Sequence, residues 1–307
     1  MKIDFDPNAY AEALKNAMNP KDEDKIINII CKRTYEERQK IKEAYNKKYN
    51  NDIIEDLKNV LHGDFEDVVT GLFYTSIDYD CLQLRKAVKG LGTDEDTLIE
   101  ILCTRPYNII EQIKKRYSEL YPGRDLIKDI EDDTSGHFKN LLVALLSTKR
   151  NIDKNEVNKN ECEKCAKMLY EAGANKIGTD EEVFTKIFTE KSREEILCIS
   201  QLYFNLTSHT LVQDLEREFS SDTKNCLIGI LYALLNPSEF FAKCINKTIK
   251  GLGTDDTSLI RILITRKETD MYLIKEFYKK LFKRDMIKDI EDDTSGNYRK
   301  ILVQLAS

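Results

Sequence analysis

Two nearly identical stretches decide the fold: KGLGTDEDTLIEILCTR at Lys89–Arg105 and KGLGTDDTSLIRILITR at Lys250–Arg266. Each is followed by a second matched block, RDLIKDIEDDTSG at Arg124–Gly136 and RDMIKDIEDDTSG at Arg284–Gly296. Asp133 of the second block follows Gly92 of the first by 41 residues, and the same distance in the other copy, from Gly253 to Asp293, is 40. Two blocks that recur in order at one spacing indicate a duplicated structural unit.

Weaker copies occupy the rest of the chain. One opens at Gly178, in AGANKIGTDEEVFTKIF, and carries Glu218 forty positions later. Another lies near the start, where KDEDKII from Lys21 replaces GTDEDTLI and Val60 takes the place of the acid. We therefore predict four repeats and a polar linker between two halves of the chain: residues 1–76, 77–148, 149–160 (linker), 161–236 and 237–307.

Within a repeat the pattern is helical. Apolar residues after Gly92 recur at spacings of three and four, as on one buried face of a helix. Thr93 or Asp94 is suited to cap the helix that follows, and Pro106 to start the next one. About five short helices fit in each repeat and no β-type alternation competes, so the predicted fold is all-α.

The composition excludes several classes of protein. The formal net charge is −6, the opposite sign from that of a basic nucleic-acid binder. The first residues contain no apolar signal segment, and the longest apolar run, Cys226–Leu235, is too short to cross a bilayer. The eight cysteines are expected to be reduced thiols, and Cys162 and Cys165 to be two residues on one helix face.

The KGLGTD loop has the chemistry of a calcium site. Its two glycines allow backbone conformations with positive φ, which can turn several carbonyl oxygens toward one point. Carbonyls together with one carboxylate from the distant DDTSG loop are the ligands that Ca²⁺ prefers. A phosphate loop is a poor alternative, because the third glycine and the Lys-Ser/Thr pair are missing. Plain helix connections with glycine caps remain an alternative for any single loop. No EF-hand loop is present.

The paired KGLGTD and DTSG loops, with the R-D-L/M-I-K-D-I block between them, resemble those of the annexins over nearly the whole chain. The resemblance implies a curved disc of four five-helix repeats with calcium loops on its convex face. It also implies calcium-dependent binding to anionic phospholipid, above all phosphatidylserine. The protein would then be cytoplasmic and peripheral at membranes when calcium rises.

The family pattern also implies the calcium ligands. Carbonyls and one carboxylate would hold the ion in three repeats: Val88, Gly90, Gly92 and Asp133 in the second; Gly173, Lys176, Gly178 and Glu218 in the third; Ile249, Gly251, Gly253 and Asp293 in the fourth. Repeat three departs from the pattern at Phe219-Ser220-Ser221, which leaves its loop geometry open. Repeat one has Met18-Asn19-Pro20-Lys21 without glycine, so no such site is predicted there.

One carboxylate for each site predicts weak affinity in free solution, with lipid oxygens completing the coordination. The loop tips carry apolar residues beside lysines: Leu91, Ile177 and Leu252 beside Lys89, Lys176 and Lys250. The apolar tips either pack under the loop or insert among headgroups, and the lysines either meet phosphates or are simply solvated.

Two other classes of function compete with membrane binding. A cytoskeletal or scaffolding protein would use the repeat surface for protein contacts or self-association and could carry degenerate calcium loops. The nearly complete loops of repeats two and four argue against that loss. An enzyme would need a nucleophile motif, and the scattered histidines His62, His137 and His209 provide none. We therefore expect no enzymatic activity.

Overall fold

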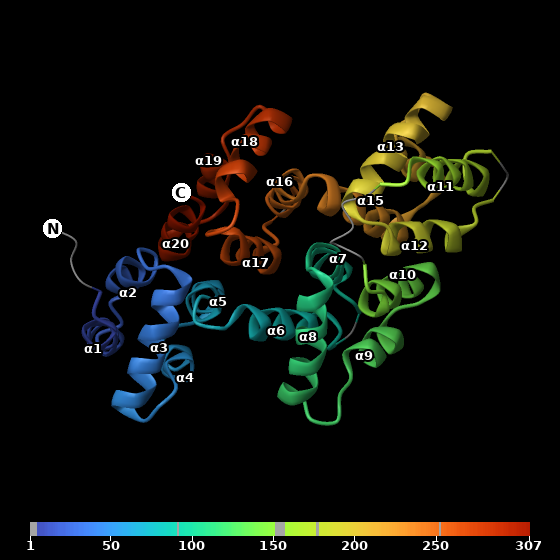
Figure 1. Cartoon of the computed structure of the whole chain (residues 1–307). Helices are drawn as coiled ribbons and strands as arrows, with labels where there is room; N and C mark the ends of the chain where they lie inside the picture. Colours follow the sequence, from blue (N-terminus) through green and yellow to red (C-terminus); the bar gives the residue numbers. More distant parts are fainter. Residues whose placement is uncertain (1–4, 91, 151–156, 176–177, 252) are drawn as a thin grey trace. The chain divides into compact units, whose positions relative to one another are not determined.

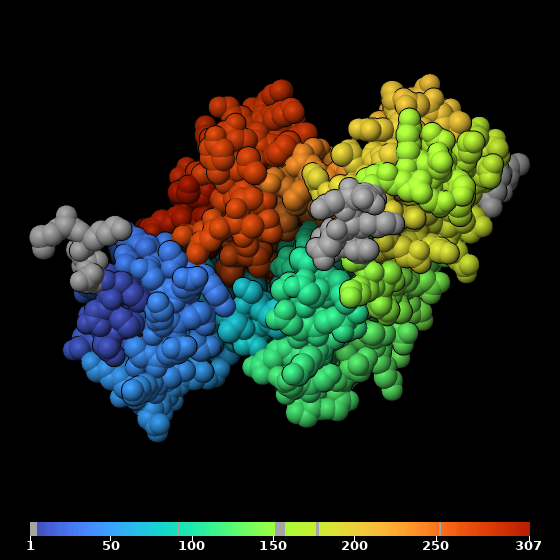
Figure 2. Space-filling model, in the orientation of Figure 1, coloured from blue at the N-terminus to red at the C-terminus, as the bar shows by residue number. Residues whose placement is uncertain are grey.

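The computed structural model describes residues 5–90, 92–150, 157–175, 178–251 and 253–307. The described residues form twenty α-helices and no β-strand, which confirms the all-α prediction (Figure 1). Figure 2 draws the same residues in colour as a space-filling surface. None of the described helices is both long enough and apolar enough to cross a bilayer.

Five helices fall in each repeat, as the hydrophobic spacing predicts. Repeat one contains α1 (Pro7–Met18), α2 (Glu23–Ile30), α3 (Tyr35–Tyr49), α4 (Ile53–Lys58) and α5 (Gly63–Gly71). Repeat two contains α6 (Ser76–Ala87), α7 (Glu95–Thr104), α8 (Tyr107–Leu120), α9 (Leu126–Asp133) and α10 (Gly136–Ser147). Repeat three contains α11 (Lys159–Ala172), α12 (Glu181–Glu190), α13 (Arg193–Thr207), α14 (Leu211–Glu218) and α15 (Ser221–Leu235). Repeat four contains α16 (Pro237–Thr248), α17 (Asp256–Arg266), α18 (Met271–Phe282), α19 (Met286–Asp293) and α20 (Gly296–Ala306).

The compact units of the chain do not coincide with its two halves. Repeats one and four form a terminal unit (residues 1–79 and 241–307), and repeats two and three form a central unit (residues 80–240). The residues on either side of the predicted linker therefore pack together in one unit. Helix α11 begins at Lys159, within the last residues of the segment predicted as linker.

In the central unit, α7 of repeat two packs on α15 of repeat three. Their close approach needs a glycine, since a Cβ at Gly229 would lie 3.0 Å from Ile99 Cγ2. The terminal unit has a similar close helix contact, in which Gly71 at the end of α5 faces Ile264 on α17. Each unit is thus joined by an apolar helix crossing between its two repeats.

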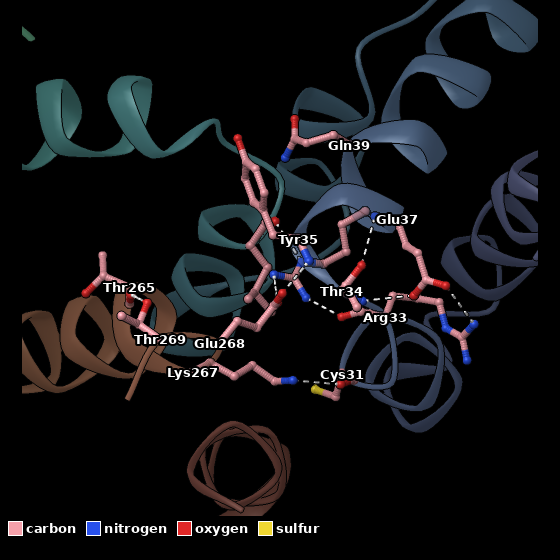
Figure 3. Close-up of polar contacts among 12 residues, drawn as sticks. Cys31, Arg33, Thr34, Tyr35, Glu37, Gln39, Thr265, Lys267, Glu268 and Thr269 are labelled. Atoms are coloured by element: carbon pink, nitrogen blue, oxygen red, sulfur yellow. Dashed lines mark hydrogen bonds and ion pairs between the residues drawn. The ribbon is translucent and has the colours of Figure 1, made fainter. Parts of the chain in front are cut away.

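A polar network adds to the crossing in the terminal unit. Figure 3 shows Lys267 and Glu268, which follow α17, facing the turn between α2 and α3. Glu268 accepts from the backbone N–H of Tyr35 and pairs with Arg38, both at 2.9 Å. Lys267 Nζ donates to the carbonyl of Cys31 at 3.2 Å, at the C-terminus of α2. Because Arg38 is only 3% exposed, Glu268 and the backbone carbonyls that accept from Arg38 offset the cost of burying its charge.

We expect Arg38→Met to destabilise the protein, because it leaves the carbonyls of Leu72 and Arg33 without their donor. The free energy of unfolding should fall by about 2–4 kcal/mol, as for a broken buried charge network. Urea denaturation would measure it. The control Lys48→Met removes an exposed pair with Glu12 and should leave the midpoint unchanged. Equal shifts in the two variants would contradict this role for Arg38.

Candidate calcium-binding loops

The loop between the first and second helices of every repeat is closed by the same backbone hydrogen bond. The N–H of the aspartate that precedes the second helix donates to a carbonyl at the end of the first helix. The pairs are Asp22 to Ala17 (2.8 Å), Asp94 to Ala87 (3.0 Å), Asp180 to Ala172 (2.8 Å) and Asp255 to Thr248 (2.9 Å). The enclosed segments, residues 18–21, 88–93, 173–179 and 249–254, differ in length. The helices therefore hold the two ends of each loop, whatever lies between them.

In repeat two, the structure brings the glycine loop to the acid predicted from the sequence. Gly90 and Gly92 have φ of +141° and +89°, which favour glycine. Thr93 Oγ1 donates to Asp133 Oδ2 at 2.8 Å and to the Asp133 carbonyl at 2.9 Å. Asp133 is the last residue of α9, half-buried beside the loop. Val88 begins the same loop and is buried.

Repeat four has the same arrangement. Thr254 Oγ1 donates to Asp293 Oδ2 at 2.6 Å, and Gly253 has φ of +91°. The loop turns back on itself, since a Cβ at Gly251 would lie 3.9 Å from the carbonyl oxygen of Gly253. Ile249 is the first residue of the segment that the closing hydrogen bond encloses. Asp293 ends α19 as Asp133 ends α9.

Repeat three brings its loop and its acid together by a different local route. A Cβ at Gly173 would lie 3.5 Å from Glu218 Cγ, so the loop begins against the acid. Thr179 Oγ1 reaches Glu218 Oε2 at 3.4 Å, which is longer than the corresponding bonds of repeats two and four. Gly178 has φ of +85°. Lys176 and Ile177, named as ligand and loop tip, lie outside the described residues, as do the tips Leu91 and Leu252.

The unusual Phe219-Ser220-Ser221 of repeat three keeps the backbone of the DTSG loops. Ser221 has φ of +49°, close to the +60° of Gly136 and the +61° of Gly296 at the same place. A serine in this left-handed region is strained, so its surroundings must hold it there. Phe219 packs edge-on against Phe184, with ring centroids 4.9 Å apart. Phe219 takes the place of a threonine in repeats two and four. There the threonine hydroxyl donates to a backbone carbonyl one turn earlier in the fourth helix.

Repeat one keeps the backbone turn of the loop but lacks the carboxylate beside it. Lys21 holds the positive φ of +55°, and Asp22 still caps α2 by accepting from Lys25 N–H. Val60 stands where the other repeats carry an acid, just beyond the end of α4. A valine provides no oxygen ligand from its side chain, so the residues present do not form a calcium site of the predicted type.

The three remaining loops fit a hard divalent cation. Each pairs glycine-rich backbone with one half-buried carboxylate, and in each the second carboxylate oxygen accepts no hydrogen bond from the described residues. Among these residues no three His, Cys, Asp or Glu side chains gather in a group. A site here would therefore rely on backbone carbonyls, which Ca²⁺ accepts readily.

A known protein family matches the chain in all four repeats. The annexin family model matches residues 9–72, 79–145, 164–230 and 240–305. The chain belongs to the annexin family. It is 39% identical to human annexin A7 over 304 residues, which cover 98% of this chain and 62% of that protein.

Solved annexin structures are also similar to this chain. Annexin III superposes with a TM-score of 0.94 at 33% identity, covering 99% of this chain and 94% of that one. Calcium-bound annexin (Sm)1 superposes with a TM-score of 0.86 at 29% identity, covering 99% of this chain and 90% of that one. The all-helical, four-repeat architecture predicted from the sequence is thus the annexin fold.

Other sequence features of this annexin have structural roles. Asp94 caps α7 through Thr97 N–H, as predicted, whereas Thr93 binds the acid of the calcium loop instead. Cys162 and Cys165 are buried free thiols on α11. His137 pairs with Glu181, which joins α10 to α12 within the central unit.

A buried tyrosine in each repeat, which sequence reasoning missed, anchors the fourth helix, and in repeats two, three and four that helix also carries the acid beside the glycine loop. The tyrosine hydroxyl donates to an aspartate on the fourth helix, one turn before the acid position. The pairs are Tyr45–Asp56, Tyr117–Asp129 (2.7 Å), Tyr203–Asp214 (2.7 Å) and Tyr278–Asp289 (2.6 Å). The signal was present in the sequence as a tyrosine followed eleven or twelve positions later by an aspartate.

Burial, and then the bonded aspartate, raises the pKa of each of these tyrosines, that of Tyr45 to about 12 from an ordinary 10. Because each tyrosine holds its proton more tightly in the folded chain, its contribution to the free energy of unfolding is fully present below about pH 10. That stability is lost as the pH rises from about 10 toward 12, because the unfolded chain ionises first. Urea midpoints between pH 9 and 12 should therefore fall less steeply in Tyr45→Phe than in wild type. Parallel slopes would refute the assignment.

Proposed function

We propose that this annexin binds anionic phospholipid membranes, above all those containing phosphatidylserine, in a calcium-dependent way through its second, third and fourth repeats. One observation carries the proposal: in all three repeats, a threonine after the glycine loop reaches an acid some forty residues away. The family is known for calcium-dependent phospholipid binding. A relative of the same fold, annexin (Sm)1, has a calcium-bound structure.

The proposed ligands are the carbonyls of each loop and one carboxylate. They are Val88, Gly90, Gly92 and Asp133; Gly173, Lys176, Gly178 and Glu218; and Ile249, Gly251, Gly253 and Asp293. The threonine hydroxyl occupies one carboxylate oxygen and leaves the other for the cation. Helix-end acids held in this way need little reorganisation on binding, which favours affinity.

A cation is also what an acidic protein needs in order to approach an acidic surface. The net charge is −6, and phosphatidylserine headgroups carry negative charge. Calcium bound at the loops would be shared with lipid phosphate or carboxylate oxygens. Lys89 and Lys250, both exposed, flank two of the loops and would add attraction of about 1 kcal/mol each near such a surface.

Each site has a single carboxylate and should be weak alone, so binding would depend on several sites acting together. We infer that the protein is cytoplasmic and associates peripherally with membranes when calcium rises. We assign it no enzymatic activity, since its annexin relatives are generally membrane-binding proteins without one.

The acids can be tested together. The triple variant Asp133→Asn, Glu218→Gln, Asp293→Asn should lose calcium-dependent co-sedimentation with phosphatidylserine liposomes, because each proposed site loses its only carboxylate. Its helical circular dichroism should be unchanged, since the acids lie at helix ends. Pelleting that still responds to calcium and chelator would show the site assignment to be wrong.

A matched control separates site chemistry from bulk charge. Asp132→Asn, Glu216→Gln, Asp292→Asn changes three exposed acids on the same helices and alters the net charge by the same three units. This variant should pellet with calcium as wild type does. If it fails equally, repulsion or helix charge, rather than coordination, controls binding.

The threonine contact makes a finer prediction. Thr254→Val removes the 2.6 Å hydrogen bond that orients Asp293 while keeping the side-chain shape. We expect the calcium affinity of repeat four to fall by roughly three- to tenfold, the equivalent of about 1 kcal/mol. Calorimetric titration on a background of Asp133→Asn and Glu218→Gln would isolate that site. Unchanged affinity would exclude an orienting role for Thr254.

A further inference from the structure

A cavity of about 210 Å³ lies in the central unit, away from the calcium loops. It is bounded by the C-terminal ends of α7, α10, α12 and α15 and by the first residues of α8 and α13. Three arginines line it, and none of its described lining residues is an aspartate or a glutamate. The described lining residues therefore bring positive charges and no negative one.

Arg150 is the cation in this wall that has no acidic partner in the described chain. Its guanidinium donates to the carbonyls of Phe188 and Thr189 at the C-terminus of α12, the latter at 3.3 Å. Burial lowers the pKa of Arg150 to about 10, so the group is still charged at neutral pH. Among the described residues its partners are carbonyl dipoles, and a cation bonded to dipoles rather than to a carboxylate retains attraction for an anion.

The other two arginines are already paired or partly paired. Arg105 binds both oxygens of Asp80 at 2.7 and 2.8 Å, so its charge is compensated. Arg193 donates to the carbonyl of Leu234 at 2.9 Å and lies 3.7 Å from Glu194. An anion entering the cavity would therefore meet Arg150 as its main partner.

The rest of the cavity determines what else the ligand must offer. Leu102, Ile110 and Leu145 contribute apolar wall, while Thr148 and Tyr107 add hydroxyl groups. A small inorganic anion would leave the apolar wall uncovered, and an uncharged apolar molecule would leave Arg150 without a counter-ion. A molecule with one oxyanion group on an apolar body satisfies both parts.

We propose that this cavity binds a small amphipathic anion, a carboxylate or sulfonate on an apolar body, with its charged group against Arg150. The site is distinct from the proposed calcium loops, because none of its described lining residues belongs to them. Its occupancy does not require calcium or a membrane.

The probe for the test is 8-anilinonaphthalene-1-sulfonate, titrated into the full chain in chelator and followed by fluorescence and calorimetry. We expect saturable binding of one molecule per chain, with displacement by octanoate. Arg150→Gln should weaken that binding at least about tenfold, because a charge-assisted contact is lost. The matched control Lys267→Gln removes a basic residue that also bonds a helix-end carbonyl, but in the terminal unit, and should bind as wild type does.

A second variant guards against a folding defect in the first. Leu145→Trp fills the apolar end of the cavity, leaves Arg150 in place and should also abolish binding. Circular dichroism and the melting temperature decide which variants are folded. Wild-type affinity in either folded cavity variant, or an equal loss in the control, would overturn the proposal.

Discussion

The hydrogen bond from a buried tyrosine to an aspartate on the fourth helix is the contact on which each repeat depends. Asp129, Asp214 and Asp289 are buried, and the tyrosine hydroxyl gives each of them a hydrogen bond in a place with little access to water. Arg124 and Arg284 approach the same carboxylates in repeats two and four. The bond ties the fourth helix to the third, and in repeats two, three and four the acid one turn further on lies beside the glycine loop. The same helix therefore carries a core contact and a proposed calcium ligand.

Much of this arrangement was predictable because it rests on local signals that recur. Hydrophobic spacing gave the helices, and the repeated blocks gave the four units and the pairing of each loop with its acid. Asp94 was recognised as a cap because capping needs only an aspartate before a helical run. The absence of a site of this type in repeat one stays a prediction, which rests on Val60 having no oxygen in its side chain.

What the sequence did not reveal depends on contacts between distant residues. Thr93 reads as a second capping candidate, and only the folded chain brings its hydroxyl to Asp133. Ser221 replaces the glycine of the other repeats, yet its φ of +49° lies in the same left-handed region as theirs. The pairing of repeat two with three, and of one with four, was hidden because it depends on helix crossings at Gly229 and Gly71. A polar linker indicates a boundary between two segments of the sequence. It does not predict which helices pack against each other on its two sides.

The closing hydrogen bond explains how one repeat can lose its site while the fold persists. It joins the same helix ends in all four repeats, whether the loop between them is short, as at 18–21, or long, as at 173–179. The tyrosine and aspartate pair is likewise retained in repeat one, where no acid follows it. Neither device uses a loop oxygen. Apart from buried loop residues such as Met18 and Val88, the loop sequence can therefore change with little effect on the core, and the number of proposed calcium sites can differ between chains of this fold.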